Sequence, residues 1–456
     1  MVSAPDHVGG DLAHLIHPLT DHAQLPETEP LVLERGEGCE VMTWDGLRLL
    51  DGMAGLWAVN LGHGRQDLVD AAARQMQKLP YAATFGGVSS PPAIELAGKI
   101  VELSPPGLGG VFFTSGGSEA NETAIKLARR HWVRDGRPEK SVVLAHDRGY
   151  HGLTGVATAA TRLAPYHLDF GVEAPDVHEV PAPYPYRCAA GVPCQPQTCP
   201  VCGGEALEET VRALGQDRVA AVIVEPVFGS GGVIVPPPGY LRRLREICDR
   251  LDLLLIVDEV ITGFGRTGAW FACEHEGVTP DLLTFAKGVT SGYVPLGGVV
   301  VSEDLWEELR DPARDPGVLM HGFTHSGHPV ACAVALAAIE AIEREDLLAR
   351  VREASRTLAG LVAPLRGSPE VGEVRQAGLM AGVELVADKA TRQRWPVEAK
   401  RGRRVAGEAR RRGLLTRSLL DDILCLAPPF TVSDEEMERA VRILGESIEA
   451  TEAPHR

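Results

Sequence analysis

The chain has 456 residues, enough for two or three domains, and its 44% hydrophobic content is ample for a buried core. A formal net charge of −17, without a dense Lys/Arg tract, argues against nucleic acid or an anionic membrane surface as the main partner. Residues 1–30 lack an apolar signal core, and no run approaches the roughly 18 uncharged apolar residues of a membrane span, so we expect a cytoplasmic protein.

The predicted elements alternate between strand and helix along the middle of the chain. A small antiparallel hairpin with a turn at Asp45-Gly46 is predicted first, over residues 34–50. Strand patterns follow at 109–115, 141–146, 219–226 and 253–259, and helix patterns lie between them at 118–132 and 240–251. Because the strands are apolar on both faces and alternate with helices, they predict a parallel sheet covered by helices.

The composition changes towards the C-terminus. Residues from about 330 onward are rich in helix patterns, followed by a short strand in GLMAGVEL and an Arg-rich helix in KRGRRVAGEARRR. We therefore expect a large domain at 61–328, with residues 1–60 and 329–456 forming a second, smaller domain.

In open parallel sheets, ligands bind at the carboxyl ends of the strands. A motif of small residues follows the strand predicted at 109–115. Ser115-Gly116-Gly117-Ser118 opens the predicted helix at 118–132. Its backbone N–H groups would lie at the positive end of the helix dipole, which favours phosphate binding. An ordinary helix cap by Ser118 fits the same residues.

Two ionisable residues follow later apolar strands. Asp258 ends the run LLLIV, where a carboxylate needs a cation or hydrogen-bond donors; magnesium and ribose are alternative partners. Lys287 follows LLTFA and is one of only seven lysines among 45 Lys+Arg. Unlike guanidinium, its amine can lose a proton and attack a carbonyl carbon, although a lysine extending to solvent also fits. Because both residues follow strands, we expect them at the same edge of the sheet.

A phosphate cradle, a reactive lysine and a buried acid are the parts needed to hold pyridoxal 5'-phosphate (PLP), with Tyr150 after the strand at 141–146 as a flat group to stack on its ring. The motif DEVITGFGRTG, with FAKG placing Lys287 29 positions after Asp258, resembles the class III (omega) aminotransferases of PLP fold type I. The similarity runs from about His17-Pro18 to Ala427-Pro428-Pro429. It implies an α/β fold whose large domain has a mainly parallel seven-stranded sheet flanked by helices, with a smaller α+β domain.

The resemblance also implies roles for individual residues. Lys287 would be the Schiff-base lysine, and Asp258 the partner of the pyridine nitrogen. The further cofactor contacts that it implies are Gly117, Ser118, Tyr150, Val260, Glu225, Phe323 and Thr324. The last two match a segment that reaches the phosphate of the neighbouring subunit's cofactor, which implies a homodimer with shared active sites; a tetramer is left open.

Two further segments, GLWAVNLGHGR and GLLTRSLLDDILCLAPP, resemble the amine:pyruvate branch of this family. Trp57 would wall the substrate pocket, and Arg417 would bind a carboxylate or swing aside for a hydrophobic amine; core packing and a surface salt bridge are the alternatives. The other substrate contacts implied are Phe85 from the partner subunit, Leu19, Tyr150 and Ser230. Ser230 replaces a glutamate usual in the ornithine and GABA branches, which argues against those substrates.

The resemblance implies a ping-pong transaminase, working through an internal aldimine, that moves an amino group from an amine or omega-amino acid to pyruvate or a similar 2-oxo acid. Alternatives are another class III PLP enzyme, such as a taurine, diamine or β-alanine aminotransferase, an aminomutase or a decarboxylase, and more distantly a non-catalytic PLP-binding protein. The sequence fixes neither the natural donor nor the enantiopreference.

Four of the nine cysteines are clustered as C-x5-C-x4-C-x2-C: Cys188, Cys194, Cys199 and Cys202. Four thiols with a CPxC turn suit a structural zinc ion, but the earlier spacings are not a standard pair of knuckles. We therefore expect no metal and free thiols in a surface loop, with zinc and a disulfide as alternatives.

Overall fold

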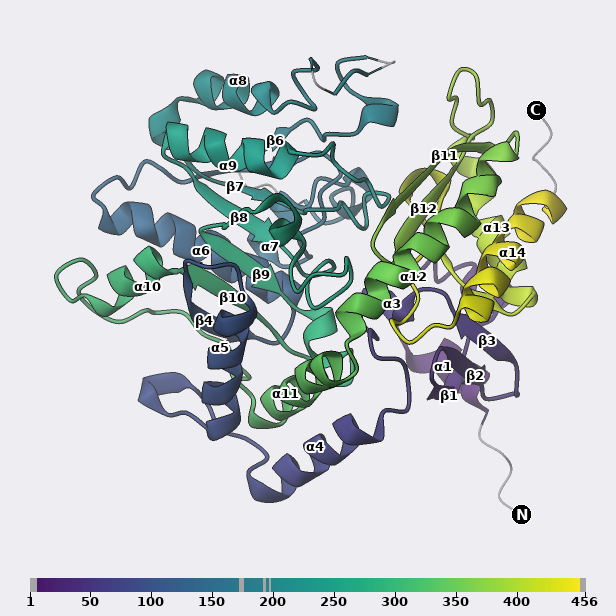
Figure 1. The fold of residues 1–456 in the computed structure, drawn as a ribbon, viewed down its shortest axis with the longest axis horizontal. Coiled ribbons are helices and arrows are strands. Elements are labelled where there is room, and N and C mark those ends of the chain that lie inside the picture. Colours follow the sequence, from purple (N-terminus) through teal and green to yellow (C-terminus); the bar gives the residue numbers. More distant parts are fainter. Residues whose placement is uncertain (1–5, 172–175, 192–193, 197, 452–456) are drawn as a thin grey trace.

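The computed structural model describes residues 6–171, 176–191, 194–196 and 198–451. The outer ends of the two predicted terminal segments, 1–5 and 452–456, lie outside the described residues. The chain forms a large region around one sheet and a smaller region built from both of its ends (Figure 1).

The helices and strands follow the expected order. The helices are α1 His7–His14, α2 Leu25–Thr28, α3 Ala54–Trp57, α4 Gln66–Lys78, α5 Pro91–Leu103, α6 Gly117–Arg134, α7 Gly155–Ala160, α8 Glu205–Leu214, α9 Tyr240–Leu251, α10 Glu303–Arg310, α11 Pro329–Arg344, α12 Leu347–Val362, α13 Arg401–Arg411 and α14 Asp434–Ala450. The strands are β1 Leu33–Glu37, β2 Glu40–Thr43, β3 Arg48–Asp51, β4 Leu108–Thr114, β5 Val142–His146, β6 Val177–Val180, β7 Val219–Val224, β8 Leu254–Asp258, β9 Leu282–Phe285, β10 Gly297–Ser302, β11 Val371–Ala377, β12 Met380–Leu385, β13 Leu414–Leu415, β14 Arg417–Leu419 and β15 Ile423–Leu426.

The central sheet has seven strands in the order β4-β10-β9-β8-β7-β5-β6. Strands β6, β5, β7, β8 and β9 pair in parallel, which confirms the mainly parallel sheet. Strand β10 runs against them, because it pairs antiparallel with β9 on one side and with β4 on the other. The strand predicted at 109–115, observed as β4, therefore has the same direction as the five parallel strands. The reversal of β10 follows from the short connection at 286–296, which contains no crossover helix to return the chain to the same end of the sheet.

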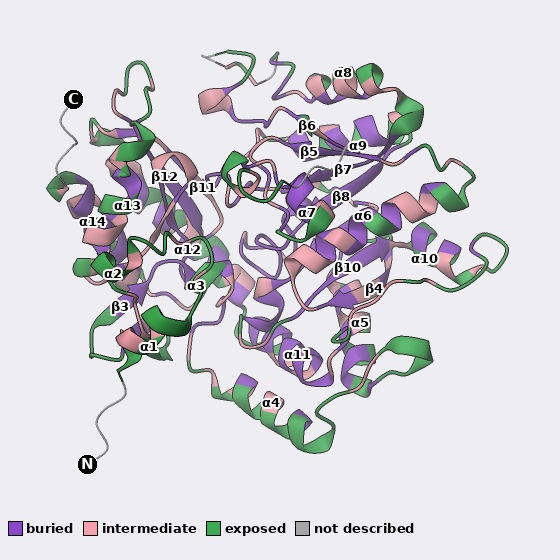
Figure 2. Ribbon diagram, turned by 180° about the vertical axis from the view of Figure 1, so that it is seen from behind, coloured by how far each residue is buried: buried purple, intermediate pink, exposed green. Residues whose placement is uncertain are grey.

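Apolar side chains cover both faces of this sheet, as the continuous apolar strand patterns predict. Leu144, Val222 and Leu255 face one buried cluster together with α9, while their neighbours Val143 and Ile223 face a second cluster with α6. The alternation follows from the two-residue period of a strand. Figure 2 shows the strands of this sheet buried between the helices that cover them.

The smaller region joins the two ends of the chain. The predicted hairpin forms as β2 and β3, and β13 pairs in parallel with β3, with Leu414 opposite Leu50. A second sheet, β11-β12-β15-β14, is built from the C-terminal segment alone. Helix α11 contributes side chains to the core of the large region and to that of the smaller one, so the predicted domain boundary at 329 remains a prediction. None of the described helices is long and apolar enough to cross a membrane.

Candidate active site

Asp258 and Lys287 lie at the same edge of the central sheet, as predicted. Asp258 is the last residue of β8, and it pairs in register with Thr284 of the parallel strand β9. Lys287 follows β9 by two residues, with a positive φ of 46°. A lysine in the left-handed region is uncommon, and such strain concentrates at functional sites.

The Asp258 carboxylate is buried and fixed by three hydrogen bonds. Asn121 Nδ2 donates to Oδ2 over 2.7 Å, and His151 Nδ1 donates to the same oxygen over 2.8 Å. The backbone N–H of Val260 donates to Oδ1 over 3.0 Å. Only 4% of the side chain of Asp258 is exposed, so these donors replace water. Oδ1 retains capacity to accept one more proton donor, such as a ring N–H.

Lys287 is partly buried beside two carboxylates. Burial lowers the pKa of its ammonium group, and the negative charges of Asp258 and Glu225 oppose that shift. A lowered pKa increases the fraction of neutral amine near neutral pH, and the neutral amine is the form that attacks a carbonyl carbon. The surroundings of Lys287 therefore suit a nucleophile better than a lysine extended into solvent.

The first turn of α6, predicted as a phosphate cradle, lies against the segment that follows Asp258. A Cβ added to Gly117 would lie 2.8 Å from Val260 Cγ1, so the loop after β4 touches the segment after β8. Ser115 N donates to Glu119 Oε2, but no side chain among the described residues caps the first turn of α6. The N-terminal amides of an 18-residue helix are thus available to an anion, which favours the phosphate interpretation over the ordinary cap.

Glu225 and Tyr150 are joined at this edge. Tyr150 N donates to Glu225 Oε1 over 2.9 Å, and Gly229 N donates to Oε2 over 3.0 Å. Burial raises the pKa of Glu225 to about 7. The ring of Tyr150 meets that of Tyr166 edge to face, with ring centroids 5.4 Å apart, and burial raises the pKa of Tyr150 to about 12.

Arg417 lies near these two tyrosines. Its charge lowers the pKa of Tyr150 and of Tyr166, against the larger raising effect of burial. Among the described residues Arg417 forms no ion pair, so the surface salt bridge considered for it is not found. Its guanidinium is therefore available to a carboxylate from outside the chain.

Trp57 is buried in an apolar cluster beside β14 and β15. Its neighbours in the cluster include Leu419, Ile423 and Cys425. Trp57 has a positive φ of 57°, and its indole Nε1 has no hydrogen-bond partner among the described residues. The burial of Trp57 agrees with core packing, the alternative considered for it. Its strained backbone and its position near β14, the strand of Arg417, agree with a pocket wall.

Three residues expected to act across a subunit boundary lie on the surface. Phe85 is 52% exposed, Thr324 is exposed and Phe323 is partly buried. The two segments lie side by side, because Tyr81 OH donates to the carbonyl oxygen of Thr324 over 2.9 Å. Neither segment is joined to Asp258 by the hydrogen bonds of the described residues.

The remaining expected pocket residues differ in position. Ser230 is partly buried in the segment after Gly229, which Glu225 anchors. Leu19 is 56% exposed, with a positive φ of 53°, and belongs to none of the buried clusters of the described residues. The single chain therefore does not place Leu19 in the pocket.

Sequence reasoning missed several polar residues of the site. His151 and Asn121 hold Asp258, and Thr284 Oγ1 donates to Asn121 Oδ1 over 2.8 Å. Tyr166 was also not singled out. His151 adjoins Tyr150 and Asn121 lies in the first turns of α6, so their positions after strands were signals that could have identified them.

Arg266, within DEVITGFGRTG, is another missed residue. It is completely buried, and it donates to Asn60 Oδ1 and to the carbonyl oxygen of Pro428, each over 2.6 Å. Burial without a carboxylate partner lowers its pKa to about 9. Arg266 thereby joins the loop after β8 to the N- and C-terminal segments.

The donor set fits PLP. A helix N-terminus suits its phosphate, a fixed buried carboxylate suits its ring nitrogen, and a lysine of lowered pKa suits its aldehyde. The contact between Gly117 and Val260 leaves no room for a side chain where the cofactor would lie against the α6 turn.

Comparison with known proteins agrees with this geometry. Residues 23–448 match the family model of aminotransferase class-III. A Pseudomonas aeruginosa protein named putrescine–pyruvate aminotransferase is 39% identical over 441 residues, covering 96% of this chain and 95% of that protein. The crystal structure of an (S)-enantioselective omega-transaminase from Thermomicrobium roseum matches with a TM-score of 0.92 and 45% identity, over 97% of each chain. That of an omega-transaminase from Pseudomonas jessenii, in complex with PMP, matches with a TM-score of 0.93 and 35% identity, over 98% of each chain. The chain therefore belongs to the class III aminotransferases, PLP-dependent enzymes of fold type I.

Proposed function

We propose that the enzyme moves an amino group from an amine or omega-amino acid to pyruvate or a similar 2-oxo acid. The observation that carries this substrate class is Arg417, an arginine without an acidic partner among the described residues, placed near Tyr150 and Tyr166. A guanidinium binds the carboxylate of a 2-oxo acid through two parallel hydrogen bonds. When it turns outward, the aromatic and apolar surroundings suit an uncharged amine. The names of the relatives from P. aeruginosa and T. roseum support the same substrate class.

PLP, when bound, supplies an aldehyde that condenses with amines and a ring that accepts electrons. We assign to Lys287 Nζ the proton transfer at the donor's amine-bearing carbon, because burial favours its neutral form. Asp258 Oδ1 would accept the ring N–H, while Asn121 and His151 hold the other oxygen in place. The amides of Gly117 and Ser118 would bind the phosphate.

We propose further that the enzyme works as a homodimer. Support comes from Phe85 and Thr324, which lie together on the surface rather than at the Lys287 edge. The same two segments expose further apolar side chains, Val88 after Phe85, and Val318 and Met320 before Phe323. A second copy of the chain would cover such a surface and would bring Phe323 and Thr324 to the partner's phosphate.

The test is a panel of donors assayed with pyruvate as the acceptor: a hydrophobic amine, a diamine, β-alanine and taurine. We expect alanine to form with at least one donor, and Lys287→Ala to abolish its formation. Arg417→Ala should raise the KM for pyruvate at least about tenfold, because it removes a charge-assisted bidentate contact. The half-reaction with the hydrophobic amine, followed by the change in cofactor absorbance, should keep its rate within about threefold.

Arg442→Ala is the matched control, since Arg442 pairs with Glu446 on the surface of α14, and it should leave both measurements unchanged. An Arg417→Ala enzyme with the wild-type KM for pyruvate would remove the basis for this substrate class. The enzyme would remain a class III aminotransferase in that case, and another residue would have to bind the acceptor's carboxylate.

A further inference from the structure

The four clustered cysteines converge on one point. They lie between a 3-10 turn at Pro185–Arg187 and the start of α8. Their sulfur atoms all lie within 4.8 Å of one another. Three of the four residues are buried, which the expected surface loop of free thiols does not predict.

The sulfur separations differ from those of a disulfide. Cys188 Sγ lies 3.3 Å from Cys199 Sγ and 4.0 Å from Cys202 Sγ, and Cys194 Sγ lies 3.5 Å from Cys202 Sγ. A disulfide bond holds its sulfurs about 2.05 Å apart. Four thiolates around one zinc ion, with Zn–S bonds of about 2.3 Å in a tetrahedron, lie about 3.8 Å apart. These three separations bracket that value, and no two of the four sulfurs are more than 4.8 Å apart, so their spacing is close to that of four ligands around one ion.

The backbone around the sulfurs is also arranged as in a metal knuckle. The N–H of Cys202 donates to Cys199 Sγ over 3.5 Å, and Gly204 turns the chain into α8 with a positive φ of 93°. Val201 and Ala206 pack against the cysteines as an apolar surround. The sulfurs accept hydrogen bonds from one another and from the Cys202 amide, and the Val201 amide also donates to Cys199.

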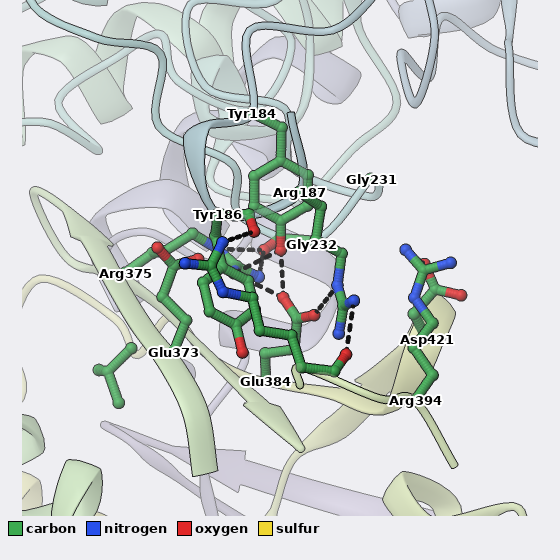
Figure 3. A network of polar contacts seen from close by, with 12 residues as sticks. Tyr184, Tyr186, Arg187, Gly231, Gly232, Glu373, Arg375, Glu384, Arg394 and Asp421 are labelled. Carbon is green, nitrogen blue, oxygen red and sulfur yellow. Dashed lines mark hydrogen bonds and ion pairs between the residues drawn. The ribbon is translucent and has the colours of Figure 1, made fainter. Parts of the chain in front are cut away.

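The residue before Cys188 enters a buried polar network (Figure 3). Arg187 Nε donates to Glu384 of β12, and the other Glu384 oxygen accepts a hydrogen bond from Arg375 over 2.7 Å. Arg375 in turn donates to the carbonyl oxygen of Gly232 over 2.8 Å. Gly232 lies in the segment that follows Glu225 and contains Ser230. The cysteine loop is thus connected, through Arg187, both to the smaller region and to the edge of the active site.

We propose that Cys188, Cys194, Cys199 and Cys202 bind one zinc ion in a closed structural site, which fixes Arg187 against Glu384. The chain itself supplies four ligands, so the ion keeps no open position for water or substrate and is not catalytic. Binding converts the thiols to thiolates and releases their protons to solvent. The oxidation state of the sulfurs does not change.

The test begins with the wild-type holoenzyme, expressed with zinc and purified without chelator. Elemental analysis should give about one zinc per chain. A thiol reagent should release this zinc, detected with a chromogenic chelator. The intact mass should show nine reduced cysteines. Less than about 0.1 zinc per chain, a mass lower by the hydrogens lost in disulfides, or iron in place of zinc would each overturn the proposal.

Variants identify the ligands. Cys199→Ser and Cys202→Ser should each lower the zinc content at least about fivefold, because a hydroxyl is a poor ligand for zinc. Cys332→Ser, in the buried face of α11, is the matched control and should keep its zinc. Full zinc content in the Cys199→Ser/Cys202→Ser double variant would contradict the proposal. If these variants fail to fold, the zinc content and the mass of the wild-type enzyme still test whether the chain binds zinc.

A last measurement separates this site from the cofactor. Removing zinc from the holoenzyme with a chelator should lower its melting temperature by several degrees, while the absorbance of bound PLP persists below the transition. Unchanged melting together with complete zinc removal would contradict the role assigned to the ion.

Discussion

At the residue scale, the two buried carboxylates of the site, Asp258 and Glu225, differ in the hydrogen bonds that they accept. Asp258 accepts three hydrogen bonds, two of them from side chains. Among the described residues, Glu225 accepts two hydrogen bonds, both from backbone amides, and burial raises its pKa to about 7. For Glu225, burial penalises the charged form by more than these two hydrogen bonds favour it. The negative charge of Glu225, where present, favours the ammonium form of Lys287.

The raised pKa of Glu225 predicts a pH-dependent stability of the apoenzyme. Between the ordinary glutamate pKa of 4.5 and about 7, the folded chain binds more protons than the unfolded chain, so stability should fall as the pH rises through this window. Glu225→Gln should flatten that fall. The measurement is urea unfolding of the apoenzyme from pH 5 to pH 8.

The slope with pH is the informative quantity for Glu225→Gln. In Glu225→Gln, the side-chain NH2 group faces one of the two backbone N–H groups that the carboxylate accepted from. This unsatisfied donor lowers the free energy of unfolding by about 1–3 kcal/mol at every pH. Glu449→Gln, an exposed change on α14, should keep the wild-type slope. An equal slope in Glu225→Gln would show that Glu225 does not titrate in this range.

At the element scale, the N-terminus of α6 has two functions. Its helix packs along the central sheet, and its first turn provides the proposed phosphate amides. The close approach of Gly117 to Val260 requires a residue without a side chain, although alanine would otherwise favour the helix. Glycine at this position therefore reflects the space needed at the site and not helix stability.

We predict that Gly117→Ala weakens PLP binding at least about tenfold, because its Cβ would lie 2.8 Å from Val260 Cγ1 and displace either the helix turn or the valine. The dissociation constant is measured by titrating the apoenzyme with PLP. Adding Val260→Ala should recover part of the affinity. Gly98→Ala in α5, where an added Cβ meets nothing within 4 Å, is the control. Wild-type affinity in Gly117→Ala would exclude the turn as the phosphate site.

At the scale of the whole molecule, one chain supplies Lys287 and Asp258 from one edge of its central sheet and Arg417 from β14 of the smaller region, but leaves Phe85 and Thr324 on its surface. The two chains of a symmetric dimer are equivalent. If one chain contributes a segment to its partner's site, the partner contributes the same segment to the first chain's site. The proposed homodimer would therefore contain two sites, each built from both chains.

Subunit mixing tests this arrangement. Lys287→Ala removes a residue of the chain's own site, and Thr324→Glu places a carboxylate against the partner's phosphate, so each variant alone should be inactive. After the two are unfolded and refolded together, random pairing should restore about a quarter of the wild-type activity, since half of the dimers contain one intact site.

Mixing Lys287→Ala with Asp258→Asn is the control, because both changes affect the chain's own site and no hybrid contains an intact one. No recovery in the first mixture, or equal recovery in both, would contradict shared sites. The mass in solution should be about twice 48.8 kDa for a dimer.

Much of the fold could be predicted from the sequence because its signals are local. Apolar runs and helix periodicity gave β5, β7, β8 and α9 at nearly their observed bounds. The antiparallel direction of β10 could not be predicted in the same way. It depends on where the chain turns back after Lys287 and not on the residues of the strand.

The sequence by itself determined the family, the cofactor and the placement of Asp258 and Lys287 at strand ends, because a parallel sheet brings successive carboxyl ends to one edge. Only the tertiary structure decided which groups surround them: His151 reaches Asp258 from 107 positions away, and Asn121 from 137. The same holds for Arg417 beside Tyr150, and for four cysteines whose spacing alone left zinc, disulfide and free thiols open. Contacts between distant residues depend on the path of the folded chain, and local patterns carry no information about that path.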